Sequence, residues 1–544
     1  MRSLVSVCLT LFARHAALAA SLAAPAPPKV TLDAGTFLGT VDGLAHRFTG
    51  IPFAQPPIGD LRLRLPVAPP PYTGTHNATA FGLACTQLPS GPDFPASIAS
   101  NVTAFFDGMA PPQSGEDCLT INVWTPAGVA PGAKLPVVVW IYGGGFTMGS
   151  TGAFNGSAVV SRSVEMGTPV VYVSMNYRLS VFGFLASKEV MDARVGNLGL
   201  QDQRLALHWV QKYVHAFAGD PTKVTIWGES AGAVSVAMHL VANRGAAQGL
   251  FRGAFMNSGS PLSTGDLTHA QQFYDSVVAD TGCAGARDTL QCLREAPFEV
   301  LQSAAMALPG LFTPQSLNIP FNPRADGVFI TDNPQTLVAR GEIADVPFVN
   351  GDCDDEGTLF TIQLLNITTE AELRTYLATI YLPGATPAEL DDVLRLYPQD
   401  PAQGSPFGTG AANALSPQFK RLAAIQGDLI FQAERRFLLA QRAGKQRVFS
   451  YLNKRLKATP GLGSAHATDL LNVYGPGDMT DYLVNFVNNL DPNGPGLLHW
   501  PAFTEAERQL LTFQDGDVPL AISLDDFRAE GMALFTRLLQ ATPF

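Results

Sequence analysis

Ser230 is the middle residue of a Gly-Glu-Ser-Ala-Gly segment at positions 228–232, where it could act as a nucleophile. The Gly-x-Ser-x-Gly pattern is weak evidence by itself, because a chain with 51 glycines in 544 residues contains it by chance roughly once in three such sequences. Its surroundings are more specific. The apolar run Lys223–Trp227 predicts a buried strand, and Ala231–Val241 predicts an apolar helix. A serine in such a strand–turn–helix unit is held above the edge of a sheet. The alternative is that the segment forms an ordinary strand–helix turn without a chemical role.

A run of three glycines is the second candidate for chemistry. The Gly-Gly-Gly-Phe segment at 143–146 directly follows Pro136–Tyr142, an apolar run that predicts another buried strand. Glycines can direct consecutive N–H groups at one point, as the oxyanion of a tetrahedral intermediate requires. With the helix N-terminus behind the serine, this predicts an oxyanion hole formed by the N–H groups of Gly144, Gly145 and Ala231. A flexible loop is one alternative. A phosphate loop has little support because no Gly-Lys-Ser/Thr follows.

The serine needs a general base, and around such a turn the usual chain order is serine, acid, histidine. Outside the predicted helices, the histidines after the serine are His269, His466 and His499. His466 lies in the glycine-bearing segment 461–466, shortly after the predicted strand Arg447–Leu452, so its imidazole can reach over the sheet edge. His499 is the weaker candidate.

An acidic segment provides the candidates for the third group. After the predicted strand Val346–Asn350, the carboxylates are Asp352, Asp354, Asp355 and Glu356. Any of them could orient the histidine and stabilise its imidazolium, and position alone does not select one. We expect at least two of the others to lie in a solvated loop.

The predicted strands alternate with helices, which is typical of a mostly parallel sheet covered on both faces. The other elements predicted in this region are the strands Val170–Met175 and Arg252–Met256 and the helix Leu198–Phe217. Active sites of open parallel sheets form at the carboxyl ends of strands, where the candidate residues lie. The prediction is an α/β fold with a large, mostly parallel central sheet and a single catalytic domain over residues 25–544.

The chain resembles the type-B carboxylesterase/lipase (cholinesterase-like) family. The resemblance is carried by the Gly-Gly-Gly-Phe and Gly-Glu-Ser-Ala-Gly segments and by Cys118–Trp124, and it extends from about Gly35 to Phe535. The segments Cys283–Leu293 and Asp525–Phe535 are most similar to the fungal lipases of the Candida rugosa type.

This resemblance implies an α/β-hydrolase fold and a serine carboxylic-ester hydrolase that works through an acyl-enzyme. No metal or organic cofactor is implied. The Asp-Glu-Gly signature of the family selects one of the four carboxylates, and the family pattern places its histidine at the position favoured above. The implied catalytic residues are Ser230, Glu356 and His466.

Composition excludes some classes of partner. The chain is 46% hydrophobic, carries a net charge of −11 and has no basic run, so nucleic acid and anionic membrane surfaces are poor candidates. After the leader, no stretch has the roughly 18 uninterrupted apolar residues that a membrane span needs.

The N-terminus predicts export. Residues 1–24 resemble a secretory signal peptide, with Arg2 before the apolar run Leu4–Phe12, and a disordered tail is the alternative. Secretion agrees with Asn-x-Ser/Thr glycosylation sequons at Asn77, Asn101, Asn155 and Asn366. Four cysteines form two local pairs, which predicts the disulfides Cys85–Cys118 and Cys283–Cys292. Cys8 belongs to the predicted leader, and the remaining Cys353 is expected to be a buried small apolar residue.

The segment 86–117, between the first two of these cysteines, corresponds to a mobile lid in the lipase branch of the family. Within it, one face of a short predicted helix carries Ile98, Val102, Phe105, Phe106 and Met109. A surface helix packed on the core fits the pattern equally well. A lid would expose this face to lipid on opening, which favours a lipase or sterol esterase that binds lipid-like esters and contacts a lipid interface reversibly.

Three other functions fit parts of the pattern. A short-chain or aryl carboxylesterase would use the same residues, as would a peptidase or amidase, since acyl transfer is common to them. A neuroligin-like binding protein shares the fold without catalysis. This chain differs from such proteins because it keeps the serine, acid and histidine in order.

Overall fold

The computed structural model describes residues 26–88, 113–130, 132–475 and 477–544. The predicted leader (1–24), residues 89–112 of the predicted lid and the sequon at Asn101 lie outside these residues. No helix within the described ranges is long and apolar enough to cross a membrane.

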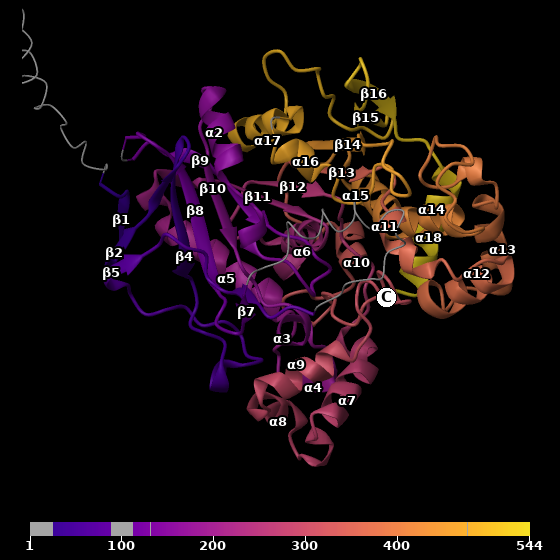
Figure 1. Cartoon of the computed structure of the whole chain (residues 1–544), viewed down its shortest axis with the longest axis horizontal. Helices are drawn as coiled ribbons and strands as arrows, with labels where there is room; N and C mark the ends of the chain where they lie inside the picture. The colour runs from indigo at the N-terminus through magenta and orange to yellow at the C-terminus, as the bar shows by residue number, and fades with distance from the viewer. Residues whose placement is uncertain (1–25, 89–112, 131, 476) are drawn as a thin grey trace, which may run out of the picture.

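An 11-stranded sheet runs through the molecule from the early to the late part of the chain (Figure 1). In spatial order its strands are β16 (Leu520–Leu524), β15 (Gln509–Gln514), β14 (Val448–Lys454), β13 (Phe348–Cys353), β12 (Gly253–Asn257), β11 (Gly219–Glu229), β9 (Leu135–Ile141), β10 (Val171–Met175), β8 (Thr120–Pro126), β4 (Ala45–Pro52) and β3 (Thr40–Asp42). Two small sheets accompany it, formed by β1 (Lys29–Leu32), β2 (Ala34–Leu38) and β5 (Thr73–Asn77), and by β6 (Ala84–Cys85) and β7 (Ser114–Gly115).

The centre of the sheet is parallel and both of its sides are antiparallel. Every pairing from β10 through β9, β11, β12, β13 and β14 to β15 is parallel. The strands β16, β8, β4 and β3 pair antiparallel with their neighbours. The expected mostly parallel central sheet is confirmed, with the six strands predicted from apolar runs at its centre. The antiparallel strands at both sides extend it beyond that prediction.

Burial on both faces explains why the sequences of the central strands are continuous apolar runs. Val137 to Ile141 of β9 are 0% exposed, because helices cover both faces of a parallel sheet. Trp140 of β9 is paired in register with Trp227 of β11, and the two indole rings lie 4.2 Å apart. This contact ties together the two strands whose ends carry the glycine run and the serine.

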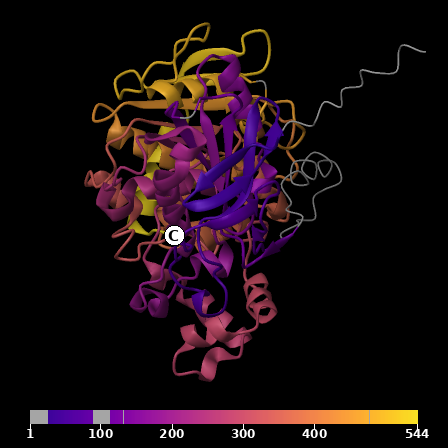
Figure 2. The same cartoon turned by 90° about the vertical axis from the view of Figure 1, so that its left-hand side faces the viewer.

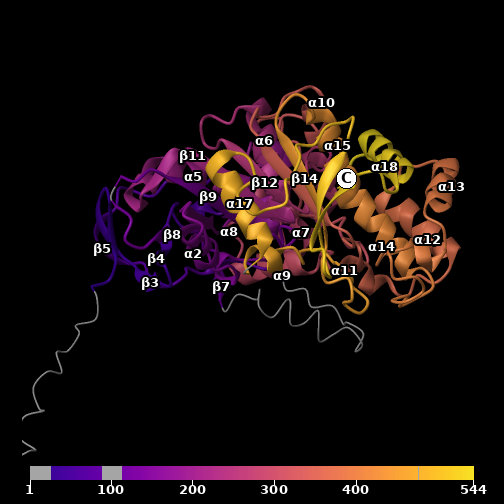
Figure 3. The same cartoon turned by 90° about the horizontal axis from the view of Figure 1, so that it is seen from above.

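Helices cover the sheet on two faces, as the view from above shows (Figure 3). One face carries α2 (Ser157–Glu165), α16 (Leu470–Val473) and α17 (Asp478–Asn489). The other carries α5 (Leu198–Tyr213), α6 (Ala231–Gly245), α10 (Pro334–Ala339) and α15 (Ala433–Arg442). Both helices predicted in this region, α5 and α6, are therefore present, and α5 continues as a 3-10 turn over Val214–Phe217.

The remaining helices form two groups outside these layers. One protrudes at the bottom of the molecule in Figures 1 and 2, and it comprises α7 (Gln271–Asp280), α8 (Thr289–Glu295) and α9 (Phe298–Met306), with α3 (Ser180–Phe184) and α4 (Lys188–Asp192) beside it. The other group lies beyond the late strands and comprises α11 (Thr358–Thr361), α12 (Glu370–Tyr376), α13 (Pro387–Leu396), α14 (Phe419–Gly427) and α18 (Ala529–Ala541). This second group has an apolar cluster of its own, separate from the core around the sheet.

Both expected disulfides are present. Cys85–Cys118 closes the segment that contains the predicted lid, and Cys283–Cys292 joins two short helical turns. Cys353 is a free thiol with 0% exposure, so the expectation of a buried residue is confirmed.

Candidate active site

Ser230 occupies a strained turn between β11 and α6. Its backbone angles are φ 56° and ψ −127°, a conformation that residues with a side chain rarely adopt. The two glycines of the motif allow this turn to be tight. A Cβ on Gly228 would lie 2.4 Å from the carbonyl of Gly232, and one on Gly232 would lie 2.0 Å from the Ile141 oxygen of β9. The tight turn therefore requires glycine at both positions, and it lifts the serine out of the sheet.

The glycine run lies beside this turn. A Cβ on Gly143 would meet the Ser230 side chain at 2.8 Å, so only glycine allows the loop to come this close. Gly144 and Gly145 have φ values of 109° and 59°. Within the described residues their N–H groups donate to no backbone or side-chain acceptor. The N–H of Ala231 also has no partner within its helix, because it belongs to the first turn of α6. These three amides are the predicted oxyanion hole.

His466 is held by Glu356. The Nδ1 of His466 lies 2.5 Å from Oε2 of Glu356 and donates to it, since a carboxylate only accepts. The other oxygen of Glu356 accepts from the Ser258 hydroxyl at 2.6 Å and from the Cys353 N–H at 2.5 Å. Glu356 is 1% exposed, so these three donors fix a buried carboxylate. The contact leaves Nε2 as the basic nitrogen of the imidazole.

The Nε2 atom of His466 faces the pocket that contains Ser230. Among the described residues it makes no hydrogen bond, and the imidazole contacts the rings of Phe360 and Phe431, with centroid distances of 5.1 and 4.8 Å. The structure thus brings the predicted serine, histidine and Glu356 to the carboxyl ends of β11, β14 and β13, on one side of the sheet. His269 and His499 are not among the residues that line this pocket.

A second carboxyl group lies close to the same imidazole. Oε1 of Glu229 is 3.2 Å from Nε2 of His466, and Glu229 is 4% exposed. Burial raises the pKa of Glu229 to about 8, and the charge of His466 lowers it only in part. Burial lowers the pKa of His466, but the charges of Glu356 and Glu229 outweigh it and raise the pKa to about 9.

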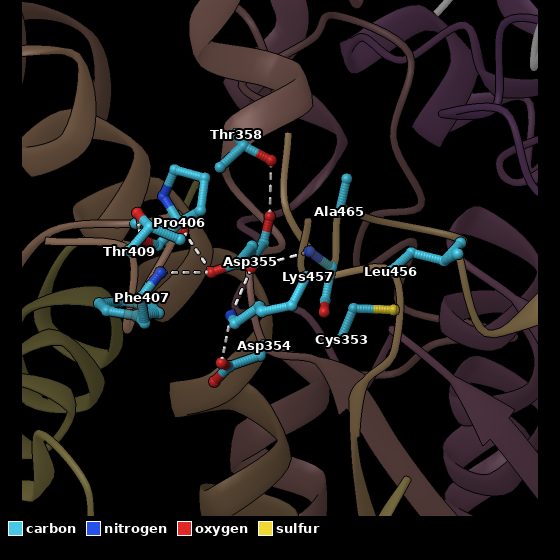
Figure 4. A network of polar contacts seen from close by, with 12 residues as sticks. Cys353, Asp354, Asp355, Thr358, Pro406, Phe407, Thr409, Leu456, Lys457 and Ala465 are labelled. Atoms are coloured by element: carbon cyan, nitrogen blue, oxygen red, sulfur yellow. Dashed lines mark hydrogen bonds and ion pairs between the residues drawn. The ribbon is translucent and has the colours of Figure 1, made fainter. Parts of the chain in front are cut away.

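The expectation of a solvated acidic loop is wrong, because all three neighbours of Glu356 are buried. Asp352, Asp354 and Asp355 are 0%, 6% and 0% exposed. Asp352 is paired with the buried Arg435, while Asp354 and Asp355 both bind the ammonium group of Lys457 (Figure 4). Cations from distant parts of the chain balance these charges, which is how a buried carboxylate is tolerated.

Sequence reasoning missed Glu229 and Ser258 as parts of the site. Glu229 occupies a variable position of the serine motif, so its residue type carried no signal. Ser258 follows β12, and β12 pairs with β13. The order of the strands would have placed the end of β12 beside the acidic segment, but apolar runs alone do not reveal that order.

Comparison with known proteins decides the family. The model described as the carboxylesterase family matches residues 26–527. The chain belongs to the carboxylesterase family. Lipase 4 of Diutina rugosa is 42% identical over 94% of this chain and 96% of its own length. A secreted triacylglycerol lipase of Gibberella zeae is 40% identical over 92% of this chain and 88% of its own length. The crystal structure of EstA from Aspergillus niger is 29% identical, has a TM-score of 0.81, and is matched over 94% of this chain and 98% of that one.

This carboxylesterase therefore has the α/β-hydrolase fold and is a carboxylic-ester hydrolase, as the resemblance implied. The reading as a non-catalytic binding protein is not supported.

Proposed function

We propose that this carboxylesterase is an exported lipase-like or sterol-esterase-like hydrolase that cleaves lipid-like esters with Ser230, His466 and Glu356. In this mechanism the Nε2 of His466 takes the proton of the Ser230 hydroxyl as its oxygen attacks the ester carbonyl. Glu356 keeps the imidazole in the required tautomer and stabilises the imidazolium.

The N–H groups of Gly144, Gly145 and Ala231 stabilise the oxyanion, and each such donor typically contributes about 3–4 kcal/mol to the transition state. His466 then donates its proton to the leaving alcohol. Water hydrolyses the acyl-enzyme by the same sequence of proton transfers.

The observation that carries the lipid-like substrate is the apolar lining on both sides of Ser230. One pocket, which we name the histidine-side pocket, contains His466 and the apolar side chains of Met148, Phe154, Leu311, Phe312, Leu359 and Phe360. A second, the amide-side pocket, contains Gly145 and Ala231 together with Val234, Leu262, Leu317, Ile319, Ile430 and Phe431. An ester has two arms, and here each arm has an apolar pocket of its own. Burying each methylene contributes about 0.8 kcal/mol, so long chains are favoured.

Other observations support a secreted enzyme that contacts lipid. A relative from Gibberella zeae is named as a secreted triacylglycerol lipase. Two disulfides are typical of an oxidising compartment. The sequon residues Asn77, Asn155 and Asn366 are exposed, which glycosylation requires. We therefore also propose a cleaved leader at 1–24, a lid within 86–117 and glycans at the sequons, including Asn101, on a single catalytic domain.

A chain-length series tests this function. We expect kcat/KM on p-nitrophenyl esters to be higher for C8 to C18 acyl chains than for acetate, and rates on emulsions to exceed those on dissolved substrate. Ser230→Ala should lower kcat by at least about 10⁴-fold, because a nucleophile acts as a unit with its base. A steady fall of kcat/KM from C2 upward would instead identify a short-chain or aryl carboxylesterase. Full activity in Ser230→Ala would refute the nucleophile.

A further inference from the structure

We propose that Asp355 and Lys457 are positioning residues for His466, and that their ion pair holds the loop carrying the base in place against the acid. This inference rests on the proposed function, because it assumes that His466 is the base. Neither residue lines the pockets around Ser230, so neither touches the substrate.

Asp355 joins the acid-bearing and base-bearing segments through its backbone and its side chain. Its N–H donates to the Ser464 carbonyl at 3.0 Å, and its Oδ2 accepts from the Ser464 N–H at 2.8 Å. Asp355 and Ala465 form an isolated parallel bridge. Since Glu356 and His466 are the next residues along each segment, this short pairing fixes the distance between acid and base.

The same carboxylate holds a third segment. Oδ1 of Asp355 accepts from the Ser405 hydroxyl at 3.0 Å and from the Phe407 N–H at 2.8 Å. Figure 4 shows the hydrogen bond with Phe407. The backbone carbonyl of Asp355 accepts from the Thr358 hydroxyl at 2.9 Å, and that hydroxyl lies 2.7 Å from the carbonyl of Leu462. Asp355 is therefore the common anchor of the segments at 405–407 and 462–465.

Lys457 supplies the charge that makes this anchor stable. Its ammonium nitrogen lies 2.5 Å from Oδ2 of Asp355 and 2.5 Å from the carboxylate of Asp354. Its side chain is 25% exposed, whereas the side chain of Asp355 is fully buried. Removing the lysine would leave a buried carboxylate uncompensated, which is strongly unfavourable. We expect Asp355 to respond by moving toward solvent and taking Ser464 with it.

Gly463 shows how closely the loop packs on the carboxylate. A Cβ at this position would lie 2.3 Å from Oδ2 of Asp355, and its φ is +61°. Glycine is required here by close approach and by backbone conformation. This gives a way to displace the loop without changing any charge.

Displacement of the base matters more for the rate than for binding. A misplacement of about 1 Å in a catalytic group can cost up to about 100-fold in rate, because proton transfer depends on geometry. Substrate contacts of the apolar pockets would be unchanged, so KM should change little. A purely structural ion pair would instead change the stability and leave kcat of the folded enzyme as it was.

The experiment compares Lys457→Met, Lys457→Arg and Gly463→Ala in the full-length enzyme, with a soluble p-nitrophenyl ester. Lys457→Met and Gly463→Ala should each lower kcat about tenfold and change KM less than about twofold. Lys457→Arg should restore kcat to within about threefold, because a guanidinium can bind both carboxylates.

The matched control is Arg162→Met. Arg162 forms a bidentate pair with Asp481 between α2 and α17, and its side chain is 41% exposed. Neither residue lines either pocket. This variant should lose stability and keep wild-type kcat. As a direct readout, the low-field proton signal of the His466–Glu356 hydrogen bond should shift or broaden in Lys457→Met and Gly463→Ala, and stay unchanged in Arg162→Met.

Wild-type kcat and an unchanged proton signal in Lys457→Met and Gly463→Ala would overturn the positioning role. So would a loss of kcat in Arg162→Met equal to that in Lys457→Met. Failure of the proposed function is a separate result, because it would appear as retained activity in Ser230→Ala and His466→Ala, whatever the Lys457 variants do.

Discussion

At the scale of single residues, His466, the proposed base, lies between two carboxyl groups with different environments. Glu356 has three donors around it and binds Nδ1, so its charge is well stabilised. Glu229 lies at the other nitrogen, and its pKa is raised to about 8 by burial, so it is largely protonated at neutral pH. A neutral Glu229 leaves Nε2 subject mainly to one negative charge. The two glutamates therefore differ in charge because of their environments, although they are the same residue type.

Glu229→Gln tests this assignment through the pH–rate profile. The amide has the same shape and cannot ionise, so it removes the negative charge that Glu229 gains above about pH 8 and that stabilises the imidazolium there. We expect the acid limb of kcat/KM to move to lower pH, because the pKa of His466 falls when the contribution of Glu229 is lost. An acid limb at the wild-type position or at higher pH would contradict the assignment.

The same variant has a predicted effect on stability. The pKa of Glu229 is raised in the folded protein above its ordinary value of 4.5, to about 8. The stability that this raised pKa of Glu229 contributes is therefore complete below about pH 4.5 and is lost as pH rises through 8. Glu229→Gln lacks this loss, so its Tm relative to the wild type should increase between pH 5 and pH 8. Thermal melts across that range, with Glu165→Gln on the exposed surface as control, measure the difference.

At the scale of elements, the site depends on how closely α6 approaches the strands. Gly232 of α6 packs against the backbone of β9, and Gly228 of β11 packs against the first turn of α6. The strained φ and ψ of Ser230 persist because both contacts hold the turn from either side. The fold therefore places the proposed nucleophile by main-chain packing.

Gly232→Ala should disrupt this packing. Its methyl group would lie 2.0 Å from the Ile141 carbonyl oxygen, so α6 must move away from β9. We expect a loss of about 1–3 kcal/mol in the free energy of unfolding, as for overpacked sites, measured by urea denaturation. Labelling of Ser230 by a fluorophosphonate should slow in parallel. Gly285→Ala, where a Cβ meets nothing within 4 Å, is the control and should match the wild type. Equal stability of the two variants would contradict the packing argument.

Prediction from sequence succeeded where a local pattern determines the structure. Buried parallel strands must be continuous apolar runs, and a glycine-bracketed serine between strand and helix is typical of a nucleophile turn. It failed for the acidic segment, because the burial of Asp355 depends on Lys457, about a hundred positions later in the chain. Glu356 was selected by family resemblance alone, since its partner Ser258 becomes visible only when β12 and β13 are known to be neighbours.

At the scale of the whole molecule, the site lies where two apolar clusters meet. Phe146, Ala231 and Val234 belong to the core around the sheet. Leu311 and Phe360 belong to the cluster of the second helical group. Both pockets at Ser230 are lined from both clusters. The sheet thus supplies the proposed catalytic groups, and the helical group supplies much of the apolar wall. Chain-length preference can thus change through the helical group while the catalytic residues stay in place.

This division predicts which pocket takes which arm of the ester. In the proposed mechanism His466 protonates the leaving alcohol, and it lines the histidine-side pocket, so the alcohol should lie there. The acyl chain should then extend into the amide-side pocket, whose walls include Leu317 and Ile319.

Leu317→Trp should fill part of the amide-side pocket and shorten the preferred acyl chain. Each excluded methylene costs about 0.8 kcal/mol, or about fourfold in kcat/KM, so a C16 ester should lose at least about tenfold relative to a C4 ester. Esters of one short acid with alcohols of increasing length should keep their wild-type ranking, because the alcohol occupies the other pocket. Val518→Trp, at a surface position that is 61% exposed, is the control and should change neither series. If the variant instead discriminates by the length of the alcohol, the two arms are assigned the wrong way round.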